Sequence, residues 1–443
     1  MKRNLLICAG ILLISSCCNR NSHIGETTVT KWQDGKKGAV SLTYDDGTIN
    51  QFLKALPIMN ELNFPATFFI NTGEIKGSKY RGTFIGRPVN DIIKETADVP
   101  TNSENFYERA SAARFLGLRG TGEYHTNAGA QIDEGNPEEA YRIMDELYEK
   151  VRKGAFAPAR KSGNDNENEG VSWDDIRSFA AQGHEFASHM VTHPRLAALD
   201  EANILYELEK SREEILNQLG PEHTFSAEVP YGTENDRAME YSYKVYPALR
   251  NRMPENFLKE LNRASREDPV SADKEYVQWQ RGATTKTPMP LMKSWIDTTA
   301  SHDNIWLVLV FHGIDGIGWE ALTSEAIEDY FRYIKDKEEV LWVATFGDAA
   351  KYMRERMNST VSSENKKGSI KVSLSHSLDT SMYNLPLTLK TYVPSKWQKV
   401  IVKQGDNITT VLPLKDSNGY YVLYRAEPNS VVTELLRDQT DQV

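Results

Sequence analysis

The sequence predicts an α/β protein built on a parallel sheet, followed by a small all-β domain. Two observations carry this prediction. Short apolar runs typical of buried strands alternate with helical patterns, as in repeated β/α units. After a polar stretch at 357–368, the remaining residues hold only short strand-like runs separated by turn residues. A barrel and a doubly wound sheet both fit this alternation.

Length and composition exclude several classes of protein. The 443 residues suggest two or three domains, and 40% apolar with 26% charged residues is an ordinary globular balance. A formal net charge of −10 argues against a nucleic-acid partner held by a basic face. The three cysteines lie within the first 18 residues. The folded part therefore has no disulfide framework and no thiolate metal site.

The first element along the chain is an export signal. Lys2 and Arg3 precede an apolar run at 5–14, which is shorter than the roughly 20 residues that span a bilayer. The segment ending in Cys17 resembles a bacterial lipobox; a plain secretory signal and lipidation at Cys18 are the alternatives. We expect a signal peptide at 1–17, a tether at 18–35 and an exported protein. A lipid anchor in the bacterial cell envelope, facing the periplasm or the cell surface, would be its only membrane contact.

The strands and helices of the expected sheet then follow in order. A strand at 39–44 ends in Asp45-Asp46-Gly47, and a helical pattern and a second strand follow at 66–70. Near the far end, the apolar run 306–311 precedes His312, and a helix at 324–336 leads to a strand at 340–345. These units assign 36–356 to the α/β domain.

Long polar stretches separate these units. Residues 74–168 have few strand signals, and 233–300 are broken by prolines, so we expect both to be insertions. Between them, the spacing predicts an amphipathic helix over 200–219, with Asp200 as N-cap and Gly220 as its stop.

The C-terminal segment begins after an expected linker at 357–368. Short strands are predicted within 369–443, at 370–374, 387–393, 397–402 and 420–424. Its aromatic residues are expected to be core and packing residues of a small β-sandwich, and a sugar-stacking platform is the alternative. These residues are Trp397, Tyr383, Tyr392, Tyr420, Tyr421 and Tyr424.

Chemistry-bearing side chains gather where the predicted strands end. Asp45 and Asp46 follow the first strand, and barrels collect catalytic groups at that end, although a turn-forming Asp-Asp-Gly is common. His189 and His193 are four residues apart, a spacing at which two imidazoles can chelate one cation. His312 directly follows another strand. Each signal alone has a structural explanation, but their joint occurrence in this order favours a metal site with positions left open for water and substrate.

Four motifs in this order resemble those of the NodB-like polysaccharide deacetylases, the family-four carbohydrate esterases. They are Thr43-Tyr-Asp-Asp-Gly47, His189-Met-Val-Thr-His193, Pro230-Tyr-Gly232 and Val310-Phe-His312. The resemblance covers roughly 36–355 and implies a distorted (β/α) barrel with long insertions. The C-terminal β segment is not part of the family core.

The resemblance also implies roles for individual residues. Asp46, His189 and His193 would hold one divalent metal, most often Zn²⁺, with Co²⁺ or Ni²⁺ as alternatives. Asp45 would be the general base and His312 the general acid. The turn of Pro230 and Tyr231 would hold the oxyanion through the Tyr231 N–H. Trp279 is the candidate for the family's remaining substrate-side tryptophan.

One position departs from the family pattern. The third motif usually begins with an arginine that braces the catalytic aspartate, and Glu228 stands there instead. A carboxylate close to Asp45 would raise its pKa, and Arg281 is the candidate for the missing cation.

Three functions remain open. The first is a hydrolase that removes N- or O-linked acetyl groups from an extracytoplasmic glycan. A glycan-binding or scaffold protein with impaired catalysis on the same fold is the second, and a metal-dependent amide hydrolase acting on a small molecule is the third.

Overall fold

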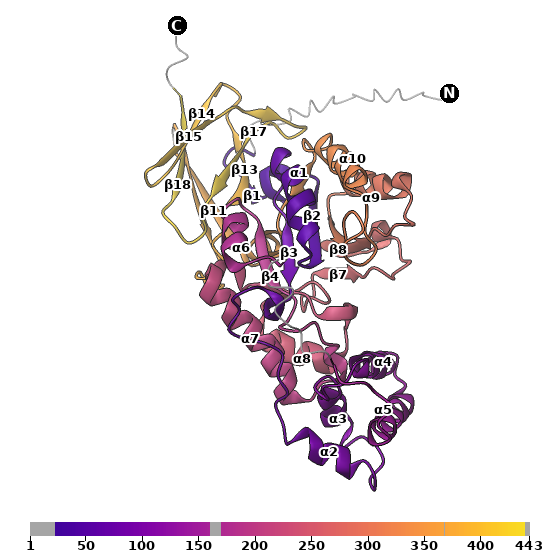
Figure 1. The fold of residues 1–443 in the computed structure, drawn as a ribbon. Coiled ribbons are helices and arrows are strands. Elements are labelled where there is room, and N and C mark those ends of the chain that lie inside the picture. Colours follow the sequence, from indigo (N-terminus) through magenta and orange to yellow (C-terminus); the bar gives the residue numbers. More distant parts are fainter. Residues whose placement is uncertain (1–22, 160–169, 367, 439–443) are drawn as a thin grey trace, which may run out of the picture. The chain divides into compact units, whose positions relative to one another are not determined.

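The computed structural model describes residues 23–159, 170–366 and 368–438 (Figure 1). The expected signal peptide at 1–17 and Cys17 lie outside these residues. The chain forms two compact units. One comprises Lys31–Met357 with Leu378–Leu385, and the other comprises the described residues up to Thr30 together with Asn358–Ser377 and those from Pro386 onward.

The first unit is built on a nine-stranded parallel sheet that forms an open (β/α) barrel. The strand order is β6-β5-β4-β3-β2-β9-β8-β7, with β10 also paired to β2. The strands are β2 (Gly38–Asp46), β3 (Thr67–Ile70), β4 (Glu185–Ser188), β5 (Ser226–Ala227), β6 (Ala248–Leu249), β7 (Leu258–Leu261), β8 (Tyr276–Gly282), β9 (Ile305–Phe311) and β10 (Leu341–Val343). Because β6 and β7 are not paired, the barrel is open between them.

The centre of the sheet is buried on both faces. β9 consists of seven apolar residues, all buried, and β2 is buried along all but its last residue. Near-continuous apolar runs of this kind are typical of parallel strands covered by helices. The predicted distorted (β/α) barrel is therefore confirmed.

Helices connect successive strands of the barrel, and one more helix, α11, follows its last strand. They are α1 (Leu56–Glu61), α6 (Trp173–Ala180), α7 (Glu201–Leu219), α8 (Asp236–Val245), α9 (Met289–Ser301), α10 (Ser324–Lys335) and α11 (Phe346–Asn358). The helix expected over 200–219 is present. The side chain of Asp200 accepts the N–H of Asn203, and Gly220 ends α7 with φ 102°. That positive φ favours glycine at this helix end.

The long stretch between β3 and β4 contains a helical insertion with its own core. It consists of α2 (Val89–Glu95), α3 (Phe106–Ala113), α4 (Thr121–Asp133) and α5 (Pro137–Arg152). Phe106, Met144, Leu147 and Tyr148 are almost fully buried among alanines. The expected insertion is therefore present, and it is α-helical.

The prediction that residues 233–300 form a second insertion is wrong. Residues 233–300 contain β6, β7 and β8, which belong to the barrel sheet, and α9. The prolines lie between these elements or in the first turn of α9, where a proline interrupts no helical hydrogen bond. Since β6 has two residues and β7 has four, neither produces a clear hydrophobic pattern.

The second unit contains two antiparallel sheets, as expected for an all-β segment. One has the order β1-β13-β17-β16 and the other β11-β12-β18-β14-β15. The strands are β1 (Thr27–Val29), β11 (Thr360–Lys366), β12 (Ser369–Ser375), β13 (Leu387–Val393), β14 (Val400–Gln404), β15 (Asn407–Val411), β16 (Leu414–Lys415), β17 (Tyr420–Ala426) and β18 (Thr433–Arg437).

Three segments differ from the expected limits of this unit. The expected linker contains β11, paired with β12 along seven residues. The expected tether contains β1, which pairs with β13. Residues 378–385 lie with the barrel unit, although they fall within 369–443. Of the aromatic residues in this unit, Trp397, Tyr392 and Tyr424 are buried, which favours a packing role, and Tyr383 is buried in the barrel unit.

Within the described residues, none of the helices combines the length and the apolar character needed to cross a bilayer.

Candidate metal centre and active site

The strand ends of the barrel bring the predicted site residues together. Asp45 and Asp46 are the last residues of β2, His189 directly follows β4, and His312 directly follows β9. These strands are parallel, so their carboxyl ends share one edge of the sheet. A cavity of about 330 Å³ at this edge is lined by these residues and by His193.

Three of these side chains form a cluster with the composition of a metal site. Ligand atoms of Asp46, His189 and His193 all lie within 4.8 Å of one another. Oδ1 of Asp46 is 3.3 Å from Nε2 of His193 and 3.8 Å from Nε2 of His189. Two imidazoles and one carboxylate are a common set for a catalytic divalent ion such as zinc, with positions left for water and substrate.

Hydrogen bonding and burial prepare this cluster for a cation. Nδ1 of His189 donates to the carbonyl oxygen of Glu228 at 2.8 Å, which directs Nε2 toward Asp46. Burial lowers the pKa of His189 to about 3 and that of His193 to about 4, so both rings are neutral at pH 7. Burial and the charges of Asp45 and Glu74 raise the pKa of Asp46 to about 7. A cation would relieve this repulsion, so the residues fit a divalent metal.

The backbone at the cluster is held in an unusual conformation. Asp46, His193 and Tyr231 have φ values of 75°, 53° and 65°, in the left-handed region that residues other than glycine rarely adopt. Such conformations persist only where the surrounding structure enforces them, and they concentrate at functional sites.

Arg250 forms a buried ion-pair network with Asp45 and Glu228. Its Nη1 and Nη2 donate to Oδ1 and Oδ2 of Asp45 at 2.7 and 2.6 Å. Its Nε donates to Oε2 of Glu228 at 3.1 Å, and Nη1 also donates to the Thr43 hydroxyl at 2.8 Å. Arg250 is 0% exposed. The guanidinium therefore fixes the orientation of Asp45 through a bidentate pair.

This network corrects the expectation for Glu228. Burial alone would raise the pKa of Asp45, but the charges of Arg250 and His312 hold it well below its usual range. Glu228 takes the opposite shift, since burial raises its pKa to about 7. The carboxyl group of Glu228 thus leaves Asp45 ionised.

The expectation that Arg281 supplies the missing cation is also wrong. Arg281 lies over the ring of Trp279 at 4.6 Å and lines a different cavity, whereas Arg250 makes the contact with Asp45. Arg250 follows β6, and Glu228 follows the neighbouring β5. Parallel pairing of Ala227 with Leu249 places the next two residues side by side. The cation therefore comes from the adjacent strand.

His312 lies on the other side of Asp45. Its Nε2 is 3.3 Å from Oδ2 of Asp45, and its ring makes an edge contact with Trp319 at 4.8 Å. Burial lowers the pKa of His312 to about 4. Trp319, which is 57% exposed, was missed by the sequence analysis, although a tryptophan within a glycine-rich turn was an available signal.

The turn of Pro230 and Tyr231 lies at the same cavity. Tyr231 lines the cavity with its side chain partly exposed, and its ring is 4.7 Å from that of His193. Within the described residues its backbone N–H donates no hydrogen bond, so this donor is available to a ligand. Pro230 is buried at the start of the turn. Trp279 is not at this cavity but lines the neighbouring one with Arg281.

The helical insertion adds a wall beside the cluster. A second cavity, of about 780 Å³, is lined by His193 and Tyr231 on one side and by Arg114 and Thr126 on the other. Arg114 donates to the carbonyl oxygen of Thr192 at 2.7 Å, which ties the insertion to the loop that carries His193. The insertion thus extends the open space next to the metal cluster.

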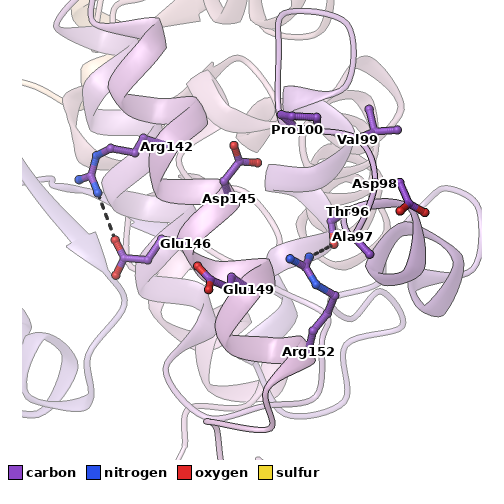
Figure 2. A pocket seen from close by; sticks show the side chains of 10 residues that line it. All are labelled: Thr96, Ala97, Asp98, Val99, Pro100, Arg142, Asp145, Glu146, Glu149 and Arg152. Carbon is purple, nitrogen blue, oxygen red and sulfur yellow. Dashed lines mark hydrogen bonds and ion pairs between the residues drawn. The ribbon is translucent and has the colours of Figure 1, made fainter.

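A further cavity lies wholly within the insertion (Figure 2). It has about 460 Å³ and lies between α5 and the segment 96–100. Two of its charged groups form an ion pair, in which Nη1 of Arg142 is 3.3 Å from Oε2 of Glu146, and Arg152 donates to the Thr96 hydroxyl. None of the site residues described above lines it, so this cavity has no place in the chemistry.

Comparison with known proteins adds the following similarities. A family model described as polysaccharide deacetylase matches residues 33–105 and 129–246. A gellan lyase from a Bacillus species is 25% identical over 277 residues. That match covers 59% of this chain, and the chain spans only 11% of the length of that relative.

Solved structures with low sequence identity are also similar. The Xyl-CE4 domain of a multidomain xylanase from the hindgut metagenome of Trinervitermes trinervoides is 14% identical, with a TM-score of 0.32 over 71% of this chain and 90% of that one. A family 4 carbohydrate esterase from Bacillus anthracis is 14% identical, with a TM-score of 0.31 over 73% and 86%.

Proposed function

Because this chain carries a polysaccharide deacetylase domain of the NodB-like, family-four carbohydrate esterase type, we propose that it is a metal-dependent hydrolase that removes acetyl groups from a glycan. The observation that supports this most directly is the adjacency of two groups of residues. The Asp46, His189 and His193 cluster could hold the ion, and the Asp45–His312 pair beside it could move protons. A divalent ion in this cluster would polarise the acetyl carbonyl and acidify a bound water.

Asp45 is the proton acceptor in this proposal. It is ionised at neutral pH because Arg250 stabilises its charge, and both of its oxygens are oriented by that pair. His312 is neutral at rest and 3.3 Å from Asp45. A proton taken from the attacking water by Asp45 can therefore pass to His312, which then delivers it to the leaving amine or alcohol.

The turn at Tyr231 completes the site. Its backbone N–H, which lies at the cavity without a hydrogen-bond acceptor among the described residues, would donate to the charge that develops on the carbonyl oxygen during attack. Trp319 covers one side of His312 and limits its exposure to water. Together these residues could catalyse the transfer of an acyl group to water.

The alternative of a catalytically impaired binding protein loses its main motive. Its two motives were Glu228 in place of the family's arginine and the lack of a clear counterpart for the family's remaining motif, for which Trp279 is the candidate. Arg250 supplies a guanidinium to Asp45 from the strand beside that of Glu228, which answers the first. We therefore retain the hydrolase as the proposed function.

Acetate release tests the proposal. The protein is incubated with acetylated chitin-type, peptidoglycan-type and xylan-type oligosaccharides, with and without a chelator, and free acetate is measured. We expect release from at least one of them, its loss with chelator and its recovery with Zn²⁺, Co²⁺ or Ni²⁺. Absence of release from these glycans and from a small acetyl ester in the metal-loaded protein would contradict the proposal.

We also propose that the protein is exported and anchored by a lipid on Cys17. The apolar segment before Cys17 and the charged start of the chain support this. Expression of the full chain in a bacterium with a labelled fatty acid is the test. Label should enter the wild-type protein and be lost in Cys17→Ser with Cys18 left intact.

A further inference from the structure

A cavity beside the catalytic pocket has a basic lining. It has about 560 Å³ and is lined by Arg263, Arg266 and Arg281, together with Trp279. Arg263 also lines the catalytic pocket, alongside Asp46 and His312. Arg263 therefore lines both spaces, which places the cavity next to the pocket.

In the part of the chain that the structure describes, the arginines of this cavity are not held in ion pairs, although Arg263 also interacts with the nearby charges of Asp46, Glu228 and Glu234. Within the described residues, the side chains of Arg263 and Arg266 form no hydrogen bond or ion pair, and Nη1 of Arg281 donates only to the Gln280 carbonyl oxygen at 3.0 Å. Two carboxylates also line the cavity. Glu267 is paired with Lys259 at 2.9 Å, and Asp268 accepts the N–H of Val270 at 3.1 Å. Three arginines against two carboxylates, one of which is paired with Lys259, leave the cavity with an excess of positive charge.

The partial burial of these arginine side chains supports an anionic ligand in the cavity. Arg263 and Arg281 are half-buried. Arg281 lies over the ring of Trp279 and donates to the Gln280 carbonyl oxygen, and neither contact carries a negative charge. Its partial burial therefore carries a desolvation cost that an anion would offset. Trp279, which is 6% exposed, adds an indole N–H that has no hydrogen-bond partner among the described residues. A planar anion such as a carboxylate matches the paired N–H donors of arginine.

We infer that this cavity binds an anionic substituent of the glycan on a sugar next to the acetylated one. The inference rests on the proposed function, and it narrows the substrate class to acidic acetylated glycans. A uronate carboxylate and a sulfate ester share the required chemistry, and separate probes distinguish them.

Direct binding to the intact, metal-loaded protein tests the inference. Three probes are titrated calorimetrically: a galacturonate trisaccharide, a sulfated galactose trisaccharide and a neutral galactose trisaccharide. The variants are Arg263→Gln and Arg281→Gln. Arg332→Gln is the matched control, because it also removes one positive charge but lies in the last turn of α10, where it pairs with Glu61 and Glu328.

We expect at least one anionic probe to bind about tenfold or more tightly than the neutral one, since hydrogen bonds to charged groups are the stronger kind. Each cavity variant should lose about tenfold in affinity for that probe, and Arg332→Gln should lose none. Equal binding of charged and neutral probes, or an equal loss in Arg332→Gln, would overturn the inference.

Hydrolysis of a small neutral acetyl ester separates this inference from the proposed function. That ester is too small to reach the cavity, so Arg281→Gln should hydrolyse it at the wild-type rate. If the wild type binds the anionic probe but releases acetate neither from the ester nor from the acetylated glycans named above, the proposed function fails and the anion site stands. If the ester is hydrolysed and no anionic probe binds better than the neutral one, the inferred anion site is refuted and the proposed function stands.

Discussion

Both carboxylate oxygens of Asp45 accept hydrogen bonds from Arg250, at 2.7 and 2.6 Å, although the two residues are 205 positions apart. Asp45 ends β2 and Arg250 follows β6, so the pair joins the middle of the sheet to one of its edges. It sets both the charge and the orientation of the residue that we propose as base.

Replacing Arg250 should therefore impair catalysis without removing the metal ligands. We expect Arg250→Met to lower kcat about 100-fold or more, the range of a misplaced acid–base group. Removal of the guanidinium leaves burial unopposed, so the pKa of Asp45 rises and the acid limb of the pH–rate profile moves to higher pH. Steady-state kinetics across pH measures both effects.

A second variant distinguishes a loss of stability from a loss of catalysis. Arg250→Met leaves two buried carboxyl groups without their cation, which is strongly destabilising. Arg250→Met combined with Glu228→Gln removes one of these charges and should restore much of the thermal stability but none of the activity. Recovery of activity in the double variant would show that Arg250 is needed only for stability.

Part of the site could be predicted from the sequence because Asp45, Asp46 and His312 end or directly follow recognisable strands. β2 and β9 are long, apolar and buried, so Asp45, Asp46 and His312 could be assigned to one edge of a parallel sheet. His189 and His193 had a chelating spacing in addition. The family resemblance then supplied a role for each residue.

Arg250 could not be predicted in the same way. It follows β6, a strand of two residues among polar and proline-containing segments, and such a strand gives no periodic signal. Its contact with Asp45 depends on the register of β5 with β6, which is a property of the folded sheet. β11 was not predicted as a strand for a related reason. Its seven residues are mostly polar and exposed, so the sequence shows no alternation of apolar and polar residues there.

The two adjacent aspartates should give separable defects. Asp45→Asn should keep metal and fold and lose most activity, because it removes the proton acceptor. Asp46→Asn should weaken metal binding as well, because Oδ1 of Asp46 faces both imidazoles. Elemental analysis after dialysis, together with acetate release, distinguishes them; identical metal content and identical residual rates would contradict the division of roles.

Metal should also stabilise the folded protein. An ion that binds only the native state at 100 times its Kd adds about 2.7 kcal/mol. We therefore expect near-stoichiometric metal in the purified protein, a lower Tm with chelator and recovery of Tm with Zn²⁺. The double variant His189→Ala with His193→Ala should contain no metal, and its Tm should not respond to chelator. A metal content equal to that of the wild type in this variant would exclude the cluster as the site.

The helical insertion should be acid-sensitive through His125. This residue is buried in α4, and its Nδ1 donates to the Ala110 carbonyl oxygen at 2.8 Å. Burial, with the charge of Arg114, lowers its pKa from 6.5 to about 3. Between these values the unfolded chain binds the additional proton, so the stability from this group is present above pH 6.5 and is lost as the pH falls toward 3.

His125→Gln removes this titration and leaves a side chain that can donate a hydrogen bond. Below pH 6.5 the wild type should lose about 1.4 kcal/mol more stability per pH unit than the variant. Urea unfolding followed by circular dichroism at several pH values between 4 and 8 measures the difference. The other buried histidines are common to both proteins and cancel in the comparison, so parallel curves would refute the assignment.

The last prediction concerns Leu378–Leu385, which lies with the barrel unit although it interrupts the all-β unit in sequence. The hydroxyl of Tyr383 accepts from Nη1 of Arg354 at 3.2 Å, and its ring meets Phe225 edge-on at 5.6 Å. The N–H of Leu385 donates to Oε1 of Glu355 at 3.0 Å. The segment therefore covers part of the barrel core.

Tyr383→Ala should accordingly destabilise the barrel by about 3 kcal/mol, the cost of removing a large buried ring. Metal content should be unchanged, and Tyr420→Ala, at a half-buried position of β17, is the control with a small effect. A chain that ends at Met357 retains Asp46, His189 and His193 but lacks the segment, so it should bind metal and melt at a lower temperature than the full chain. If that shortened chain melted at the temperature of the full protein, Leu378–Leu385 would have no stabilising role in the barrel.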